Sequence, residues 1–186
     1  GIEANVIRVV ARKYASAKRS IIFWGMGISQ SIHGTDNARC LIALSMITGQ
    51  VGRAGTGLHP LRGQNNVQGA SDAGLIPWVY PDYKSVENDE IRGVYEDLWN
   101  RELDRKKGLT VVEIMNQINA GKIQGMYVMG ENPAMSDPDA NHARAGLAKL
   151  KHLVVQDLFL TETAAFADVI LPASAFPEKT GTYTNT

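Results

Sequence analysis

The sequence predicts an α/β protein with a doubly wound, mainly parallel sheet, helices on both faces and a long Gly/Asn-rich loop insertion. Short apolar runs typical of buried strands alternate along the chain with segments whose apolar residues recur at helical spacing. Glycine-rich and asparagine-rich turns close these runs. A length of 186 residues fits a single domain, 1–186. This alternation favours a parallel sheet whose crossover helices cover both faces.

The first part of the chain predicts a helix, a strand, a turn and a second helix, which is the opening of a βαβ unit. Apolar residues at helical spacing predict a helix over about 3–17, and the run IIFW at 21–24 predicts a strand that a glycine turn ends. The next helix is expected over about 35–48, with Cys40 on its apolar face. We therefore expect Cys40 to be buried as a small hydrophobic residue.

Residues 49–82 are punctuated by glycine and proline, so they form neither one helix nor one strand. Loops this long inside a compact domain are usually functional or disordered, and we expect a functional loop here. The charged segment that follows carries a thin apolar stripe and predicts a peripheral helix over about 86–105.

Regular α/β order resumes after residue 109. Thr110 and Glu113 form a capping-box pattern ahead of a helix that Gly121 ends. A further helix is expected to start at Asp137-Pro138, because proline is common at the first helical position. Strands are expected at 126–129, 153–155 and 169–171, and a short helix at 161–166. The whole pattern is Rossmann-like.

Composition excludes several classes of protein. Nineteen basic residues balance nineteen acidic ones, so the chain lacks the basic excess of a general nucleic-acid binder. Cys40 is the single cysteine, which excludes an internal disulfide and any cysteine-built zinc or iron–sulfur site within the chain. No apolar run reaches the roughly 18 residues of a membrane span, and no signal peptide opens the chain. The chain starts with Gly1 and ends in a polar run, so we expect a piece of a longer protein. A cytoplasmic location is the expectation.

Candidate binding residues follow the expected strands. Ligands on parallel sheets bind at the carboxyl ends of the strands, and residues 24–27, 130–133 and 156–157 all lie at such ends. The turn at 25–30 resembles a dinucleotide-binding fingerprint but has Gln30 in place of the third glycine. It is either a plain structural turn or a phosphate site made by backbone N–H groups.

The loop at 62–69 places Arg62 and four side-chain amides between glycines. Such groups suit a carboxylate, a phosphate or the edge of a heterocycle. The alternative is a solvated loop in which asparagine side chains cap turns. The four histidines have no metal-ligand spacing, so we expect no metal site from these residues.

Five motifs in order resemble one enzyme family. They are WGMG at 24–27, PLRGQNNVQGA at 60–70, MGENP at 129–133, VQDLF at 155–159 and ADVILP at 167–172. With them the chain strongly resembles the catalytic (alpha) subunit of molybdopterin-dependent formate dehydrogenases over essentially its whole length. The RGQNNVQGA loop favours these enzymes over nitrate reductases and other molybdopterin oxidoreductases.

The resemblance implies the middle α/β domain of a subunit several times longer. That subunit would oxidise formate to carbon dioxide at a molybdenum or tungsten ion held by two molybdopterin guanine dinucleotides. Electrons would leave through a 4Fe-4S iron–sulfur cluster toward partner subunits carrying iron–sulfur or flavin groups, and then to NAD, ferredoxin or another acceptor. The family's metal-ligating Cys or selenocysteine and its cluster cysteines have no counterpart here, and Cys40 matches none of them. The fragment alone should not oxidise formate.

The resemblance also implies roles for particular residues. Arg62 matches the family's active-site arginine, which we expect to orient formate, and Gln64 matches its neighbour on the cofactor. Residues implied on the pterin side are Gly25, Met26, Gly27 and Gln30. Residues implied beside the guanosine and pyrophosphate are Gly130, Glu131, Asn132, Ser136, Gln156 and Asp157. Asn132 stands where an Asp is common in the family, and Ser136 where a Thr can occur. The competing interpretations are a nitrate-reductase-like enzyme and a nucleotide- or pterin-binding module without catalysis.

Overall fold

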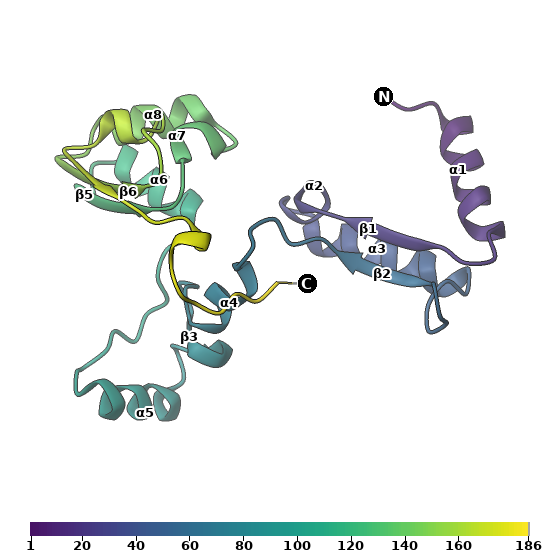
Figure 1. Ribbon diagram of the computed structural model, residues 1–186, viewed down its shortest axis with the longest axis horizontal. Coiled ribbons are helices and arrows are strands. Elements are labelled where there is room, and N and C mark those ends of the chain that lie inside the picture. The colour runs from purple at the N-terminus through teal and green to yellow at the C-terminus, as the bar shows by residue number, and fades with distance from the viewer. Residues whose placement is uncertain (186) are drawn as a thin grey trace. The chain divides into compact units, whose positions relative to one another are not determined.

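The computed structural model describes residues 1–185 and divides the chain into two compact units (Figure 1). Unit 1 comprises Gly1–Ala70 and the C-terminal residues from Tyr183 onward, and unit 2 comprises Ser71–Thr182. Each unit is described by itself. The expectation of one domain over 1–186 stays a prediction.

Unit 1 is built around two parallel strands. Its elements are α1 (Ala4–Ser16), β1 (Ile21–Trp24), α2 (Met26–Ser29), α3 (Gly34–Ile47), β2 (Gly57–Pro60) and the start of α4 (Val67–Asp72). The helix α3 connects the two strands and packs against β2. In the parallel register Ile21 lies opposite Gly57 and Trp24 opposite Pro60. The carboxyl ends of both strands therefore lie at one edge of the pair.

The described part of unit 1 buries polar side chains and no hydrophobic one. Ser45 is 0% exposed and Gln50 1% exposed. Ser45 Oγ and the Tyr14 hydroxyl share a hydrogen bond of 2.9 Å, which joins α3 to α1. Gln50 Oε1 accepts from the Ser20 N–H at 3.0 Å, and its Nε2 donates to the Ala17 carbonyl at 2.7 Å. Polar contacts thus tie the first helix to the rest of the unit, and no residue of α1 is buried.

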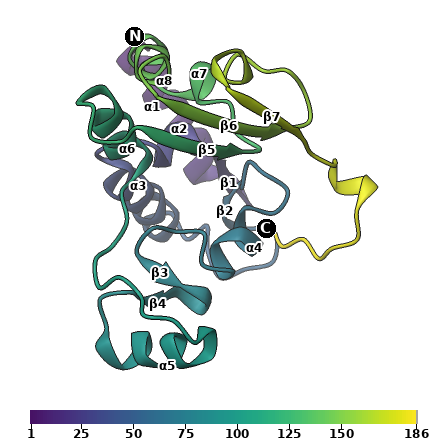
Figure 2. The same cartoon turned by 90° about the vertical axis from the view of Figure 1, so that its left-hand side faces the viewer.

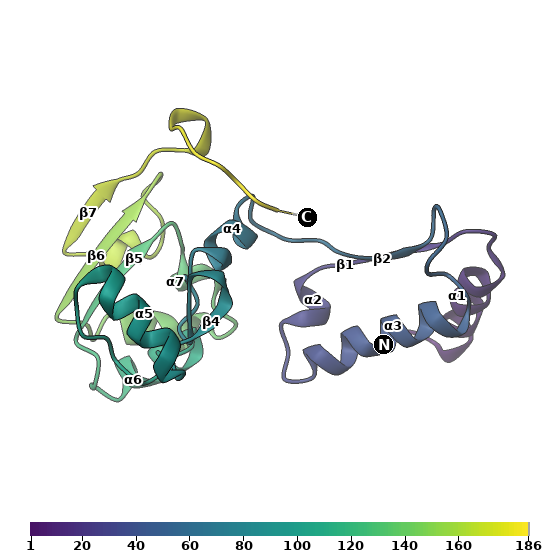
Figure 3. The ribbon, with the colours of Figure 1, turned by 90° about the horizontal axis from the view of Figure 1, so that it is seen from below.

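Unit 2 contains a three-stranded parallel sheet in the order β5-β6-β7. Its elements are β3 (Val79–Tyr80), η1 (Pro81–Tyr83), β4 (Lys84–Ser85), α5 (Asp89–Trp99), α6 (Val111–Asn119), β5 (Gly125–Met129), α7 (Pro133–Ser136), α8 (Ala140–Leu147), β6 (His152–Asp157), η2 (Ala164–Phe166), β7 (Val169–Pro172) and η3 (Phe176–Glu178). Figures 2 and 3 show the three strands side by side. The pair β3 and β4 is antiparallel, and α5 follows it as the expected peripheral helix.

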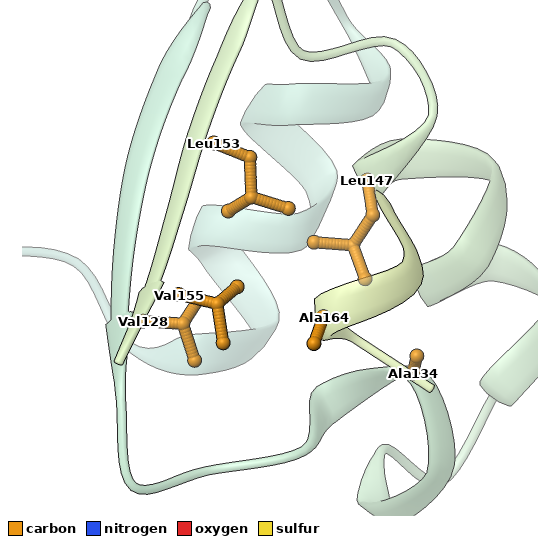
Figure 4. Packing of buried hydrophobic residues seen from close by; sticks show 6 residues of the cluster. All are labelled: Val128, Ala134, Leu147, Leu153, Val155 and Ala164. Atoms are coloured by element: carbon orange, nitrogen blue, oxygen red, sulfur yellow. The ribbon is translucent and has the colours of Figure 1, made fainter. Parts of the chain in front are cut away.

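A hydrophobic core lies on one face of this sheet (Figure 4). Val128, Leu153 and Val155 point from the strands toward Leu147 of α8 and Ala164 of η2. A second buried cluster joins α6 to α8 and consists of Met115, Ile118 and Ala143. The opposite sheet face is open, because the alternate residues Tyr127 and Met129 are exposed.

The predicted capping box at α6 is confirmed. Thr110 Oγ1 accepts from the Glu113 N–H at 3.3 Å, and the Glu113 carboxylate accepts from the Thr110 N–H at 2.7 Å. Asn88 caps α5 and Asp139 caps α8 in the same way, by accepting a backbone N–H. Helix starts in unit 2 are therefore fixed by local side-chain hydrogen bonds.

The α/β class with parallel strand pairing is confirmed, and three local predictions are corrected. Cys40 is exposed, because the inward stripe of α3 runs through Leu41 and Ser45, and Cys40 lies off it. The range 49–82 is not one loop, since it contains β2 and α4. No helix starts at Asp137-Pro138; α7 begins earlier, at Pro133, and α8 begins at Ala140. Pro133 occupies the first helical position of α7, where proline is favoured for the same reason.

Candidate cofactor-binding site

In unit 1 the candidate residues follow the carboxyl ends of β1 and β2. The Leu61 N–H donates to the Trp24 carbonyl at 2.7 Å, which extends the strand pair by one bond at this edge. The turn at 25–30 begins on one side of that bond, and the loop that carries Arg62 begins on the other. Gly25, Met26 and Arg62 therefore follow the strands at the same edge of the β1–β2 pair.

The turn after β1 is a short helix, α2, held by backbone hydrogen bonds. The Gln30 N–H donates to the Met26 carbonyl at 2.7 Å, so Gln30 closes the helix. Its exposed neighbours are Gly27 and Met26, whose side chain is 48% exposed. A close approach does exist here, but Gly34 makes it: a Cβ at Gly34 would lie 2.0 Å from the Ser29 carbonyl oxygen. The dinucleotide-binding fingerprint expects its third glycine at position 30. Gly34 lies later in the chain, so the fingerprint did not identify it.

Arg62 and Gln64 are exposed, and neither side chain has a partner among the described residues. The loop is held in place at Asn66, whose Oδ1 accepts from the Thr184 N–H at 2.9 Å. The Gly69 N–H donates to the Thr184 carbonyl at 3.3 Å. The binding role of this loop stays a prediction. Asn66 organises the backbone, and the Arg62 guanidinium is free to bind an anion.

In unit 2 a second set of candidates meets at the carboxyl ends of β5 and β6. Gly130 has φ of +66°, a left-handed conformation that glycine adopts easily, and its N–H donates to the Gln156 carbonyl at 2.9 Å. Gln156 Oε1 accepts from the Tyr127 hydroxyl at 2.5 Å. Asp157 Oδ1 accepts from the Leu158 N–H at 2.6 Å. The two bonds to Gln156 join the strand ends, whereas the Asp157 bond is local.

Asn132 is the most constrained of the candidates. Its Oδ1 accepts from the Thr163 N–H at 3.1 Å and from the Thr163 hydroxyl at 2.8 Å. Its Nδ2 donates to Glu162 Oε2 at 2.7 Å. This bond, the N–H of Glu162 itself and the charge of Arg144 hold the pKa of the Glu162 carboxyl below its usual value. Thr163 is fully buried and also accepts from the Ala134 N–H at 3.0 Å, so it links the loop after β5 to η2.

The remaining candidates in unit 2 are exposed. Glu131 and Ser136 have no side-chain partner among the described residues, and the Ser136 N–H donates to the Asn132 carbonyl at 2.9 Å. Sequence reasoning missed Tyr127, Glu162 and Thr163. The pattern Thr-Glu-Thr at 161–163, in the segment between β6 and β7, was the available signal, since such residues favour turns and caps.

A cavity of about 420 Å³ lies elsewhere in unit 2, lined in part by Trp78, Glu87 and Lys107. None of the predicted site residues lines it. The polar candidates of unit 2 gather instead at the carboxyl ends of β5 and β6. Residues 1–185 contain no cluster of three or more His, Cys, Asp or Glu side chains suited to a metal ion. Over the same residues, no helix is long and apolar enough to cross a membrane.

Comparison with known proteins gives consistent relatives. The chain is 48% identical to the F420-dependent formate dehydrogenase subunit alpha of Methanocaldococcus jannaschii over 187 residues, which is 100% of this chain and 27% of that protein. It is 44% identical to the F420-dependent formate dehydrogenase 1 subunit alpha of Methanococcus maripaludis, with the same shares covered. It is 40% identical to formate dehydrogenase H of Escherichia coli, over 99% of this chain and 26% of that protein. The chain thus spans about a quarter of the length of these relatives.

A solved structure from work on the mechanism and regulation of Sir2 enzymes aligns over 92% of each chain, with a TM-score of 0.31 and 14% identity. Values this low carry no argument. The family described as molybdopterin oxidoreductase, in contrast, matches residues 3–186. The chain, with its polar strand ends in both units, belongs to the molybdopterin oxidoreductase family.

Proposed function

We propose that this chain is part of the catalytic subunit of a formate dehydrogenase, which oxidises formate to carbon dioxide. The observation that carries the proposal is the 40–48% identity, over the whole chain or nearly so, to proteins named as formate dehydrogenases in two methanogens and in Escherichia coli. Within that enzyme the chain would hold a molybdopterin guanine dinucleotide, one of two that carry molybdenum or tungsten.

The side chains present fit such a cofactor. A cofactor with polar edges needs N–H donors, and the Gln64 amide is exposed without a side-chain partner in the described chain. A guanine or pterin ring also has acceptor atoms, and the fixed amides of Asn132 and Gln156 keep N–H groups that could donate to them at the carboxyl ends of β5 and β6. When bound, the cofactor would supply the metal that takes electrons from formate. Within unit 2 the segment 130–136 is the stretch that would contact it, and within unit 1 the turn Gly25–Gln30 is a separate candidate.

Arg62 has a distinct role in this proposal. Formate is a small anion with two equivalent oxygens, and a guanidinium grips both in a planar, bidentate arrangement. That grip fixes the direction of the C–H bond, which attraction to a compact ammonium would not do. An exposed guanidinium without a partner among the described residues is available for this task.

Other parts of the longer subunit would complete the enzyme. Cys40 is the single cysteine, so the iron–sulfur cluster and any Cys or selenocysteine ligand to the metal would come from outside these residues. Electrons would pass from there to NAD, ferredoxin or another acceptor. The 186 residues alone would not oxidise formate.

The test is steady-state assay of the full-length subunit, purified with its cofactor and normalised to molybdenum or tungsten content. We expect formate-dependent reduction of an oxidised viologen dye. Nitrate-dependent oxidation of reduced viologen, without formate activity, would show a nitrate-reductase-like enzyme instead. Neither activity at full metal and pterin content would favour a binding module without catalysis.

A further inference from the structure

The orientation of the Asn132 amide is fixed by two donors. The Thr163 backbone N–H can only donate, and it faces Asn132 Oδ1 at 3.1 Å. The Thr163 hydroxyl already accepts from the Ala134 N–H, so its proton is available for the same Oδ1 at 2.8 Å. The Asn132 nitrogen must therefore point toward Glu162, where it donates to Oε2 at 2.7 Å.

This arrangement explains why an amide stands at position 132. An Asp in the same position would place a second carboxylate oxygen against Glu162, and like charges that close are strongly unfavourable. Asn132 instead supplies a donor to Glu162 and keeps an acceptor for Thr163. Asn132 and Glu162 thus act as a matched pair, and Glu162 remains an exposed carboxylate at the edge of the site.

We propose that Glu162, held in place by Asn132, determines specificity by accepting the two adjacent N–H donors of a 2-amino-4-oxopyrimidine ring. The inference rests on the proposed function, because it names the residue that reads the cofactor. Guanine and pterin rings both carry this edge, with one ring N–H beside one exocyclic amine. A carboxylate has about four acceptor positions, so the bond from Asn132 leaves room for both donors.

The pair of adjacent N–H donors distinguishes guanine and pterin rings from similar purines. Adenine offers no ring N–H beside its exocyclic amine on its pairing edge, and hypoxanthine lacks the exocyclic amine. A site built to pair with two donors rejects an analogue that lacks one, because a charged acceptor loses its partner. The free energy of a hydrogen bond to a charged group predicts that a ring with both donors binds about 10- to 100-fold more tightly than an analogue that lacks one.

The experiment measures the dissociation constants of small probes on the cofactor-free, full-length subunit by calorimetry. GMP and IMP form one matched pair, and 6-hydroxymethylpterin and its 2-oxo analogue 6-hydroxymethyllumazine form the other. We expect wild type to prefer the 2-amino member of at least one pair by about 10- to 100-fold. The pair that shows the preference identifies guanine or pterin as the ring at this site.

In Glu162→Gln we expect that preference to fall to nearly onefold. Glu162→Asp keeps the charge and both acceptor oxygens, so it should retain part of the preference even though its contact with Asn132 is disturbed. Glu102→Gln, an exposed carboxylate elsewhere in unit 2, is the control and should behave as wild type. Thermal unfolding of each variant checks that it is folded.

Two outcomes overturn the inference: no preference in either pair for wild type, or an unchanged preference in Glu162→Gln. A purely structural Glu162 would lower thermal stability in both variants without changing the ratio of dissociation constants. Formate oxidation by the wild-type holoenzyme is scored separately. An enzyme that oxidises formate while Glu162→Gln keeps the wild-type ratio overturns this inference and leaves the proposed function standing.

Discussion

Unit 1 and unit 2 differ in how they hold some of their candidate side chains. In unit 1 the side chains of Arg62 and Gln64 have no partner among the described residues. In unit 2 Asn132 and Gln156 are fixed by hydrogen bonds from Thr163 and Tyr127. Side chains that are already fixed cost less ordering entropy when a ligand binds, whereas the Arg62 and Gln64 side chains would still have to be ordered.

The two units also differ in what stabilises them. Every hydrophobic side chain that is buried within residues 1–185 belongs to unit 2. In the described part of unit 1 the buried side chains are Ser45 and Gln50, which are hydrogen-bonded. Apolar burial supplies most folding free energy, so local stability should be concentrated in unit 2.

The largest expected effect tests that difference. Leu153→Ala removes a side chain that is 1% exposed between the sheet and α8, and should cost about 2–5 kcal/mol of unfolding free energy. Ile7→Ala in α1, where the side chain is 55% exposed, should change it by no more than about 0.5 kcal/mol. Denaturant unfolding of the full-length subunit, with hydrogen exchange resolved to each unit, measures both. Equal losses would show that α1 is buried in the full-length protein.

The next effect concerns activity rather than stability. Arg62→Lys keeps the positive charge but loses the planar fork, so formate would bind without a fixed orientation. Positioning losses of this kind cost about 100-fold in rate, which is about 2.7 kcal/mol of barrier. We expect kcat/KM for formate, per metal, to fall by about that factor, and further in Arg62→Ala, while the unfolding free energy stays unchanged. A parallel fall in metal content and stability would instead give Arg62 a structural role.

The sequence predicted the positions of four strands better than it predicted burial. Strands near 21–24, 126–129 and 153–155 are present because each is a short apolar run bounded by polar or glycine residues. Cys40 was misjudged because helical spacing defines a stripe only to within about one residue, and α3 turns Leu41 and Ser45 inward. The spacing of apolar residues identifies the apolar face of a helix, but it does not show whether another element packs against that face.

The candidate sites show the same limit. Gly130 and Gln156 were found because they end strands, a position that the order of elements reveals. The partners Glu162 and Thr163 were missed because they lie about 30 residues from Asn132. Contacts across that separation depend on the register of β5 against β6, which no local motif encodes.

A smaller effect compares the buried hydroxyls of the two units. Thr163→Val leaves the Ala134 N–H and Asn132 Oδ1 without this partner, and should cost about 1–3 kcal/mol. Ser45→Ala removes one bond, to the half-buried Tyr14 hydroxyl, and should cost about 0.5–1.5 kcal/mol. Denaturant unfolding of both variants gives the ranking. A larger loss for Ser45→Ala would mean that the polar contacts of unit 1 matter more than the network around Asn132.

The smallest effect is a pH dependence at a helix start, where the units again differ. No side-chain hydrogen bond caps α1 or α3 in unit 1, whereas Glu113 completes the capping box of α6. The Thr110 backbone N–H, and then its hydroxyl, lower the pKa of the Glu113 carboxyl in the folded protein. A carboxyl with a lowered folded pKa contributes stability above its unfolded pKa and loses that contribution as pH falls through the folded value.

Wild type should therefore lose stability below about pH 4.5, the ordinary value for a glutamate, and Glu113→Gln should lose less over the same range. Above that range the variant should be slightly less stable than wild type, because a neutral amide is a weaker acceptor for the two Thr110 donors. Glu102→Gln, which lies outside any cap, is the matched control and should follow the wild-type curve. Unfolding free energies measured from pH 7 to pH 3 separate the three proteins. Parallel curves for wild type and Glu113→Gln would show that the cap contributes nothing through its charge, and the advantage of unit 2 would then rest on apolar burial alone.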